Sequence, residues 1–139
     1  MKNKNLLIRD FTEYPGLRHK SISDDSGEEY YHKILNREFK DAYQKNFKLI
    51  VNLDKTAGFA PSFLDEAFGN LVYDFGESTV KKYLEIISND EPDLKSMILE
   101  QTLPMWQERR EKGVVPKKTA DHENWFFLDK NFELRQKKD

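Results

Sequence analysis

Hydrophobic residues recur at intervals of three and four in three parts of the chain, which is the spacing of one face of a helix. In the first part, residues 27–45, Tyr31 and Phe39 lie on the same stripe. Ser26 and Glu29 precede this stripe as a capping box, in which each side chain bonds a free backbone N–H of the first turn. The pattern therefore predicts a helix over residues 27–45.

The second helical pattern lies in "GFAPSFLDEAFGNLVYDF", residues 58–75, where hydrophobic residues follow Ser62 at helical spacing. Gly76 comes directly after the last of them, in the position of a left-handed helix terminator. We predict a helix over residues 62–75. Gly69 lies inside it, where glycine costs about 1 kcal/mol relative to alanine, so we expect it to permit close packing of the helix on the sheet.

The third helical pattern is "NDEPDLKSMILEQTL", residues 89–103. Asn89 or Asp90 can cap this helix, and a proline such as Pro92 suits a first turn. Pro104 has no amide hydrogen and clashes with the preceding turn, so the helix is predicted to end near residue 103 or to kink there.

Three segments have the patterns of strands. Residues 47–54, "FKLIVNLD", have a nearly continuous hydrophobic centre, which is typical of a central strand buried on both faces. Residues 81–88, "KKYLEIIS", predict a second strand. Residues 5–22 predict a β-hairpin, because Pro15-Gly16 is a turn signal and "LRHKSI" after it alternates hydrophobic and polar residues.

The predicted order is hairpin, helix, strand, helix, strand, helix. Strand–helix–strand connections place strands in parallel, so the pattern predicts an α/β fold with a mixed four-stranded β-sheet and helices packed on it, over residues 1–103. Residues 104–139 are charged and rich in turns, and "NWFFLDKNFELRQ" indicates two short strands. We interpret this part as a short helix and β-hairpin appendage that docks through its aromatic residues, which are Trp106, Trp125, Phe126 and Phe127.

Composition narrows the classes of protein. The 139 residues suit one domain, and the net charge of −2 does not favour a dedicated nucleic-acid binder. The chain has no cysteine, which excludes disulfides, thiolate metal sites and cysteine nucleophiles. Neither a membrane-spanning run nor a signal-peptide core is visible, so we expect a cytoplasmic protein.

No motif indicates catalysis, a metal or a cofactor. Asp65 and Glu66 are neighbours on a helix and do not face each other, so solvated acids at the helix start are the better interpretation. The three histidines, His19, His32 and His122, are far apart in sequence and are interpreted as surface residues. The basic stretch "RREKGVVPKK", residues 109–118, is interrupted by an acid, which argues against nucleic-acid binding.

Three strings carry a family resemblance. "SGEEYY" opens the first helix, "LIVNLD" forms the central strand, and "PSFLDEAFG", residues 61–69, begins the second helix. In this order they resemble the bacterial STAS-like domain family of unknown function, and more broadly the STAS domains of anti-sigma-factor antagonists. The resemblance covers roughly residues 5–103.

The resemblance implies a small bacterial regulatory module that binds another protein and is not an enzyme. In STAS proteins the loop and first turn of this helix contact a kinase of the histidine-kinase-like ATPase fold, which phosphorylates a serine there. In this chain Ala60-Pro61-Ser62-Phe63 stands where STAS proteins have Asp-Ser-Ser-Gly. Ser62 is thus the candidate phosphosite, although alignment of the hydrophobic stripes places Pro61 at the modified position.

Ser62 also has a purely structural interpretation. A serine at a helix start accepts a backbone N–H bond worth about 1 kcal/mol, and this cap is the favoured role of Ser62. For partner binding the sequence offers a loop and helix start, residues 57–66. The predicted contact residues are Phe59, Pro61, Ser62, Phe63, Asp65 and Glu66.

Two other classes of function stay open. One is a structural subunit that binds through its aromatic C-terminal residues, for which an exposed Trp106 or Trp125 would be evidence. The other is a cryptic nucleotide-binding enzyme that uses Asp54 with Asp74 or Glu77.

Overall fold

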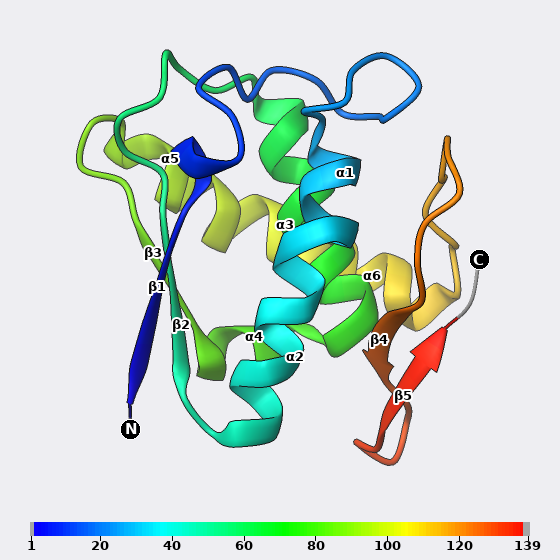
Figure 1. The fold of residues 1–139 in the computed structure, drawn as a ribbon. Coiled ribbons are helices and arrows are strands. Elements are labelled where there is room, and N and C mark those ends of the chain that lie inside the picture. The colour runs from blue at the N-terminus through cyan, green and yellow to red at the C-terminus, as the bar shows by residue number, and fades with distance from the viewer. Residues whose placement is uncertain (1, 138–139) are drawn as a thin grey trace.

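A three-stranded parallel sheet forms one side of the molecule in the computed structural model, which describes residues 2–137 (Figure 1). The strands are β1 (Asn3–Leu7), β2 (Lys48–Asn52) and β3 (Leu84–Ile87), in the order β1-β2-β3. Both pairs are parallel, with Leu6 opposite Val51 and Val51 opposite Ile86. Leu49, Ile50 and Val51 are all buried, which confirms the prediction of a buried central strand.

The chain between β1 and β2 contains one continuous helix, as predicted for residues 27–45. It consists of α1 (Gly27–Tyr30), the π-helical turn η2 (Tyr31–Leu35) and α2 (Asn36–Lys45). Its stripe packs into the core, where Tyr31 and Phe39 are fully buried. The Ser26 hydroxyl accepts the backbone N–H of Glu29 at 3.1 Å, which confirms the predicted N-terminal cap.

The second crossover contains α3 (Pro61–Phe75), close to its predicted bounds, and then α4 (Glu77–Tyr83). The strand predicted for residues 81–88 is therefore wrong in its first half, because β3 begins only at Leu84. Gly76 explains the difference: its φ of 87° lets the chain turn sharply and start a second helix at once. Val80 and Tyr83 then bury one face of that helix.

Pro104 does not end the third helix, so of the two predicted outcomes, an end near residue 103 or a kink, the first is wrong. The chain runs without a break through α5 (Pro92–Met97), the π-helical turn η3 (Ile98–Thr102) and α6 (Leu103–Lys112). The π-helical turn widens the backbone just before the proline, so the missing N–H and the ring of Pro104 are accommodated. The helix ends instead at Gly113, whose φ is 69°.

The predicted hairpin over residues 5–22 is also wrong. Only β1 forms a strand, followed by the 3₁₀ turn η1 (Ile8–Asp10) and an irregular segment that reaches α1. The alternation in "LRHKSI" does not produce a strand, because the carbonyls of Leu17 and Arg18 accept the N–H groups of Gly27 and Glu28. These carbonyls thus accept the free N–H groups at the start of α1 and are not available for pairing in a sheet.

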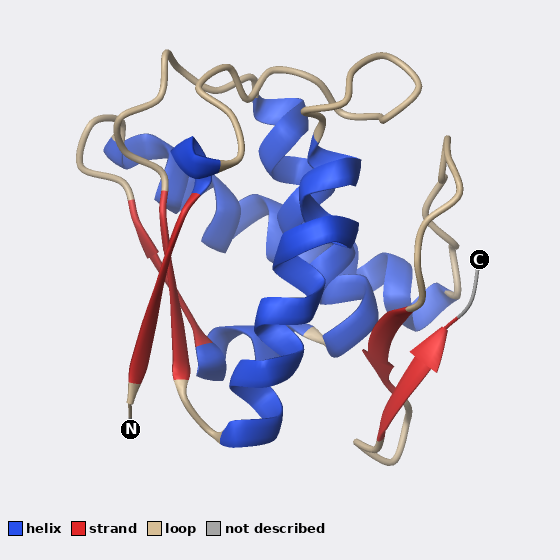
Figure 2. Cartoon of the chain, in the orientation of Figure 1, coloured by secondary structure: helices blue, strands red, loops and turns tan. Residues whose placement is uncertain are grey.

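A separate hairpin follows α6, made of β4 (Trp125–Leu128) and β5 (Leu134–Lys137), and its strands are antiparallel. These are the two short strands predicted near the C-terminus. The single mixed four-stranded sheet is not confirmed, because the five strands within residues 2–137 divide into a parallel sheet of three and this hairpin. Figure 2 shows most of the helices lying between the two sheets. Asn36 joins the hairpin to α2, since its amide donates to Phe126 O and accepts from Phe126 N, both at 2.9 Å.

Gly69 allows α3 and α6 to pack closely, with the indole ring of Trp106 seated against the glycine. The expected close approach therefore exists, but to a helix rather than to the sheet. Trp106 is only 2% exposed. The predicted boundary between residues 103 and 104 falls inside the helix that carries this tryptophan.

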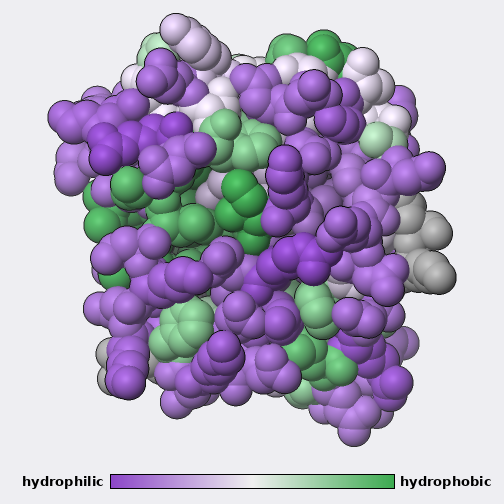
Figure 3. All heavy atoms as spheres, in the orientation of Figure 1, coloured by the Kyte–Doolittle hydropathy of each residue, from purple (hydrophilic) through white to green (hydrophobic). Residues whose placement is uncertain are grey.

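The surface is largely hydrophilic in Figure 3, with a hydrophobic area on the left of the view, where the strands lie. Among the described residues, no helix combines the length and the hydrophobicity that crossing a bilayer requires.

Candidate functional site

The first turn of α3 lacks the cap that the sequence predicted. The N-cap residue is Ala60, Pro61 is the first helical residue, and no side chain bonds the free N–H groups. Ser62 lies two residues after the N-cap position and therefore cannot cap the helix. Its hydroxyl instead donates to the carbonyl oxygen of Gly16 at 3.4 Å, so the favoured structural role of Ser62 is wrong.

Residues 13–17 lie over this first turn. The N–H of Ala60 donates to Pro15 O at 3.1 Å, and the N–H of Ala57 donates to Glu13 O at 2.7 Å. Two hydrophobic side chains from this segment stay in solvent: Tyr14 is 70% exposed and Leu17 is 42% exposed. We call the resulting surface the α3 corner, and it consists of Tyr14, Leu17, Phe59, Pro61 and Ser62.

The six predicted contact residues do not share one surface. Pro61 is exposed, and Phe59, Ser62 and Asp65 are partly exposed. Phe63 is fully buried, with its ring 5.8 Å from that of Tyr30 and 6.0 Å from that of Phe59. Glu66 is buried as well. Phe63 and Glu66 therefore support the α3 corner from below and are not available to a partner.

Asp65 and Glu66 are not solvated acids, and this prediction is corrected. One guanidinium nitrogen of Arg18 bonds both carboxylates, at 2.7 Å to Asp65 and 3.1 Å to Glu66. The indole N–H of Trp106 donates to Asp65 at 3.0 Å, and the amide of Asn70 donates to Glu66 at 2.7 Å. Burial raises the pKa of Glu66, although the hydrogen bonds from Asn70 and Arg18 oppose the shift.

A second buried carboxylate, Glu28, fastens two long loops to the start of α1. Glu28 is fully buried. From the first loop it accepts the backbone N–H of Lys20 at 3.0 Å. From the second loop it accepts the N–H and the hydroxyl of Thr119 at 2.9 and 2.6 Å, and a hydrogen bond from Nε2 of His122 at 2.6 Å. Burial alone would raise the pKa of Glu28, but the hydrogen bonds from Thr119, His122 and Lys20 lower it to about 2. We call Glu28, Thr119 and His122 the Glu28 clamp.

The histidines are not all surface residues, contrary to the prediction. His32 is 4% exposed, and its ring stacks on that of His122 with centroids 4.0 Å apart. Burial lowers the pKa of His32 to about 3, so its ring is neutral at physiological pH. One sequence signal pointed to this region: Glu28 lies three residues before Tyr31, on the buried stripe of the helix.

The acids proposed for a cryptic enzyme do not come together. Asp54 follows β2 and accepts the N–H groups of Asn89 and Asp90 at 2.7 and 2.9 Å, so it organises a turn. Asp74 lies at the other end of α3 and accepts from the hydroxyl of Tyr31 at 2.5 Å. Burial raises the pKa of Asp74 to about 6, and its side chain is 7% exposed.

A three-stranded parallel sheet backed by helices, with the start of α3 after the central strand, makes this an α/β domain. Residues 32–94 match the family model of the STAS-like domain of unknown function (DUF4325). The match confirms the resemblance. It includes "PSFLDEAFG" but not "SGEEYY", which lies before it. No curated protein and no solved structure matches the chain.

Proposed function

We propose that the chain is a non-enzymatic regulatory module that binds another protein through the α3 corner. One observation carries this proposal: Tyr14 and Leu17, both exposed, lie beside exposed Pro61 at the uncapped start of α3. Tyrosine is enriched among the residues that dominate binding at interfaces, and a proline limits the conformational entropy lost on docking. The buried network of Arg18, Asp65 and Glu66 holds this surface in place from below.

The partner that the family resemblance supports is an ATPase of the histidine-kinase-like fold. Ser62 is the hydroxyl that such a kinase would modify. Phosphorylation would replace the hydroxyl that donates to Gly16 O and would put negative charge one turn from Asp65. The repulsion from Asp65 and the lost bond to Gly16 would loosen residues 13–17, and the docked partner would be released.

The alternative of a subunit that binds through its aromatic C-terminal residues is less well supported. Exposure of Trp106 or Trp125 was the evidence it required, and each is 2% exposed. Both rings contribute to the protein's own packing, so the α3 corner offers the better surface.

The test is to recover the protein from its native cell with its partners and to compare variants of the α3 corner. We expect Tyr14→Ala and Pro61→Ala to reduce recovery of one specific partner at least 10-fold, because truncation of an anchoring residue at the centre of an interface costs about 2 kcal/mol or more. Ser62→Glu should also release this partner, whereas Ser62→Ala should retain it.

Ile22→Ala is the matched control, since Ile22 is 68% exposed on the same long segment but lies outside the α3 corner. Recovery of the partner at full yield with Tyr14→Ala and Pro61→Ala would contradict the proposal. Loss with the Ile22 variant as well would mean that the whole segment, and not the corner, is required.

A further inference from the structure

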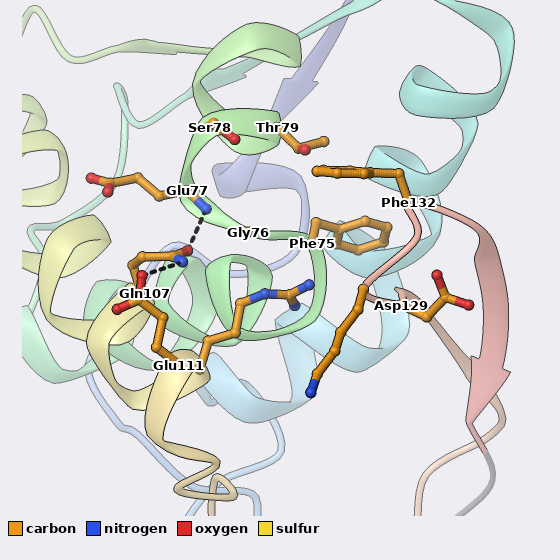
Figure 4. A pocket seen from close by; sticks show the side chains of 11 residues that line it. Phe75, Gly76, Glu77, Ser78, Thr79, Gln107, Glu111, Asp129 and Phe132 are labelled. Carbon is orange, nitrogen blue, oxygen red and sulfur yellow. Dashed lines mark hydrogen bonds between the residues drawn. The ribbon is translucent and has the colours of Figure 1, made fainter.

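A pocket of about 510 Å³ lies where α3 passes into α4, at some distance along the chain from the α3 corner. Its walls are the α3–α4 junction, one face of α6 and the turn between β4 and β5. Figure 4 shows Phe132 close to Phe75 at one side of the pocket, and Gln107 with Glu111 at the other. Gln107 accepts the backbone N–H of Glu77 at 2.8 Å, which fixes the wall made by α4.

Phe132 stands in a backbone conformation that suits glycine or asparagine. It closes the β4–β5 turn, where its N–H donates to Asp129 O at 3.0 Å, and its φ is 60°. A left-handed residue at this point of a hairpin is commonly glycine, and a bulky side chain there is an outlier. Packing does not compensate for the strain, because the Phe132 side chain is 65% exposed. Strained residues of this kind gather at ligand-binding sites.

The charges at the pocket are unequally compensated. Two of its three acids are paired with cations, Glu77 with Lys81 at 3.3 Å and Asp129 with Arg135 at 2.6 Å, and Glu111 accepts a hydrogen bond from the neutral amide of Gln107 at 3.2 Å. The carboxylates of Glu77 and Asp129 point away from the pocket in Figure 4.

Two cations also line the pocket. Arg110 is held by two carbonyls, Tyr73 O and Leu128 O, and lies in the field of buried Asp74. Lys130 is exposed, and within residues 2–137 it has no carboxylate partner. Lys130 is therefore the charge that is free to meet a ligand, with the Arg110 guanidinium deeper in the pocket.

We infer that this pocket binds a small molecule that combines a planar ring with an anionic group, the ring resting on Phe132 and the anion facing Lys130 and Arg110. Stacking of a planar ring on an aromatic side chain contributes about 1–3 kcal/mol for nucleobases, which is enough to explain an exposed phenylalanine at the rim. The volume is in the range of small-molecule sites. This inference goes beyond the proposed function and uses none of the residues of the α3 corner.

Calorimetric titration of the purified full chain tests the site with four probes: adenosine monophosphate, 4-hydroxybenzoate, inorganic phosphate and adenosine. We expect adenosine monophosphate and 4-hydroxybenzoate to bind, because each combines a planar ring with an anionic group. They represent the two classes of ligand that fit this chemistry, a nucleotide and an aromatic carboxylate. We expect phosphate and adenosine to bind at least 10-fold more weakly than adenosine monophosphate. Lys130→Ala should weaken binding of the charged probes about 5-fold or more, and Lys95→Ala, on exposed α5, should not.

Phe132→Gly separates a binding role from a structural role. We expect this variant to melt about 2–4 °C higher than the natural protein, because glycine adopts the positive φ freely, and yet to lose at least 10-fold in affinity. Lys55→Gly is the control: Lys55 also has a positive φ, 67°, so its replacement should stabilise the protein and leave binding unchanged.

Four results would overturn the inference, and the first three concern binding: no binding of either ring-bearing anion, equal binding of phosphate alone, or full affinity in Phe132→Gly. A lower melting temperature of Phe132→Gly would show that the ring serves the fold, and it would overturn the inference too. Since the α3 corner is unchanged in all these variants, recovery of the protein partner should be unaffected by them, and the two proposals can fail separately.

Discussion

Gly69→Ala should destabilise the protein by about 3 kcal/mol or more, although alanine is ordinarily the better helix residue. A Cβ atom at position 69 would overlap three atoms of the Trp106 indole. The ring cannot move aside freely, because it is buried and its N–H donates to Asp65 at 3.0 Å. Helices α3 and α6 would have to separate, and the core between them would open. Urea unfolding followed by circular dichroism measures the loss.

A double-mutant cycle shows whether the contact with Trp106 is the cause. Trp106→Leu destabilises the protein by itself, but in that background Gly69→Ala should cost less than 1 kcal/mol, because the overlapping ring is gone. An equal cost in both backgrounds would refute the explanation and place the strain elsewhere in α3.

Glu28→Ala should cost about 3–5 kcal/mol, the second large effect that the structure predicts. The substitution leaves the hydroxyl of Thr119, Nε2 of His122 and the N–H of Lys20 without their common acceptor. Both loops that carry these groups should then detach from α1. Hydrogen exchange should rise in residues 17–22 and 119–122, while α3 should keep its protection.

The same carboxylate should make stability depend on acid pH. Its pKa is about 2 in the folded protein and near 4.5 when the chain is unfolded. A lowered pKa means that the carboxylate stabilises the fold above pH 4.5 and that this contribution, about 3 kcal/mol, is lost as the pH falls toward 2. Glu28→Gln should flatten this part of the stability–pH curve, and Glu29→Gln, at a partly exposed neighbour, should not. A curve that is unchanged in Glu28→Gln would contradict the assignment.

The elements that the sequence predicted correctly are those with local patterns. The helix over residues 27–45, the helix after Pro61 and the buried strand β2 each contain enough hydrophobic positions to define a period. The errors have one distant cause and two local ones. The carbonyls of "LRHKSI" accept hydrogen bonds from the start of α1, which is a separate segment. The positive φ of Gly76 lets a new helix begin, and the π-helical turn before Pro104 accommodates the proline within the helix.

The sequence predicted that Pro61 and Ser62 lie at the surface, but it did not predict which residues surround them. The proline and serine at the start of α3 are accessible, as their place after the central strand indicated. Phe63 and Glu66 face inward because they lie on the hydrophobic stripe of α3, a fact that helical spacing contained. Tyr14, Leu17 and Arg18 were not predicted, because no local pattern brings a loop residue to a helix more than 40 residues away.

The packing of Trp106 on Gly69 limits where the protein can be truncated. The family match ends at residue 94, yet Leu103, Trp106 and Leu128 complete the hydrophobic interior of the segment before it. A fragment trimmed to the matched boundaries would leave one flank of α3 bare, and we expect it to aggregate when expressed alone. Recombinant work on this chain, and any transplant of its STAS-like part into another scaffold, should therefore carry the segment through β4 along with it.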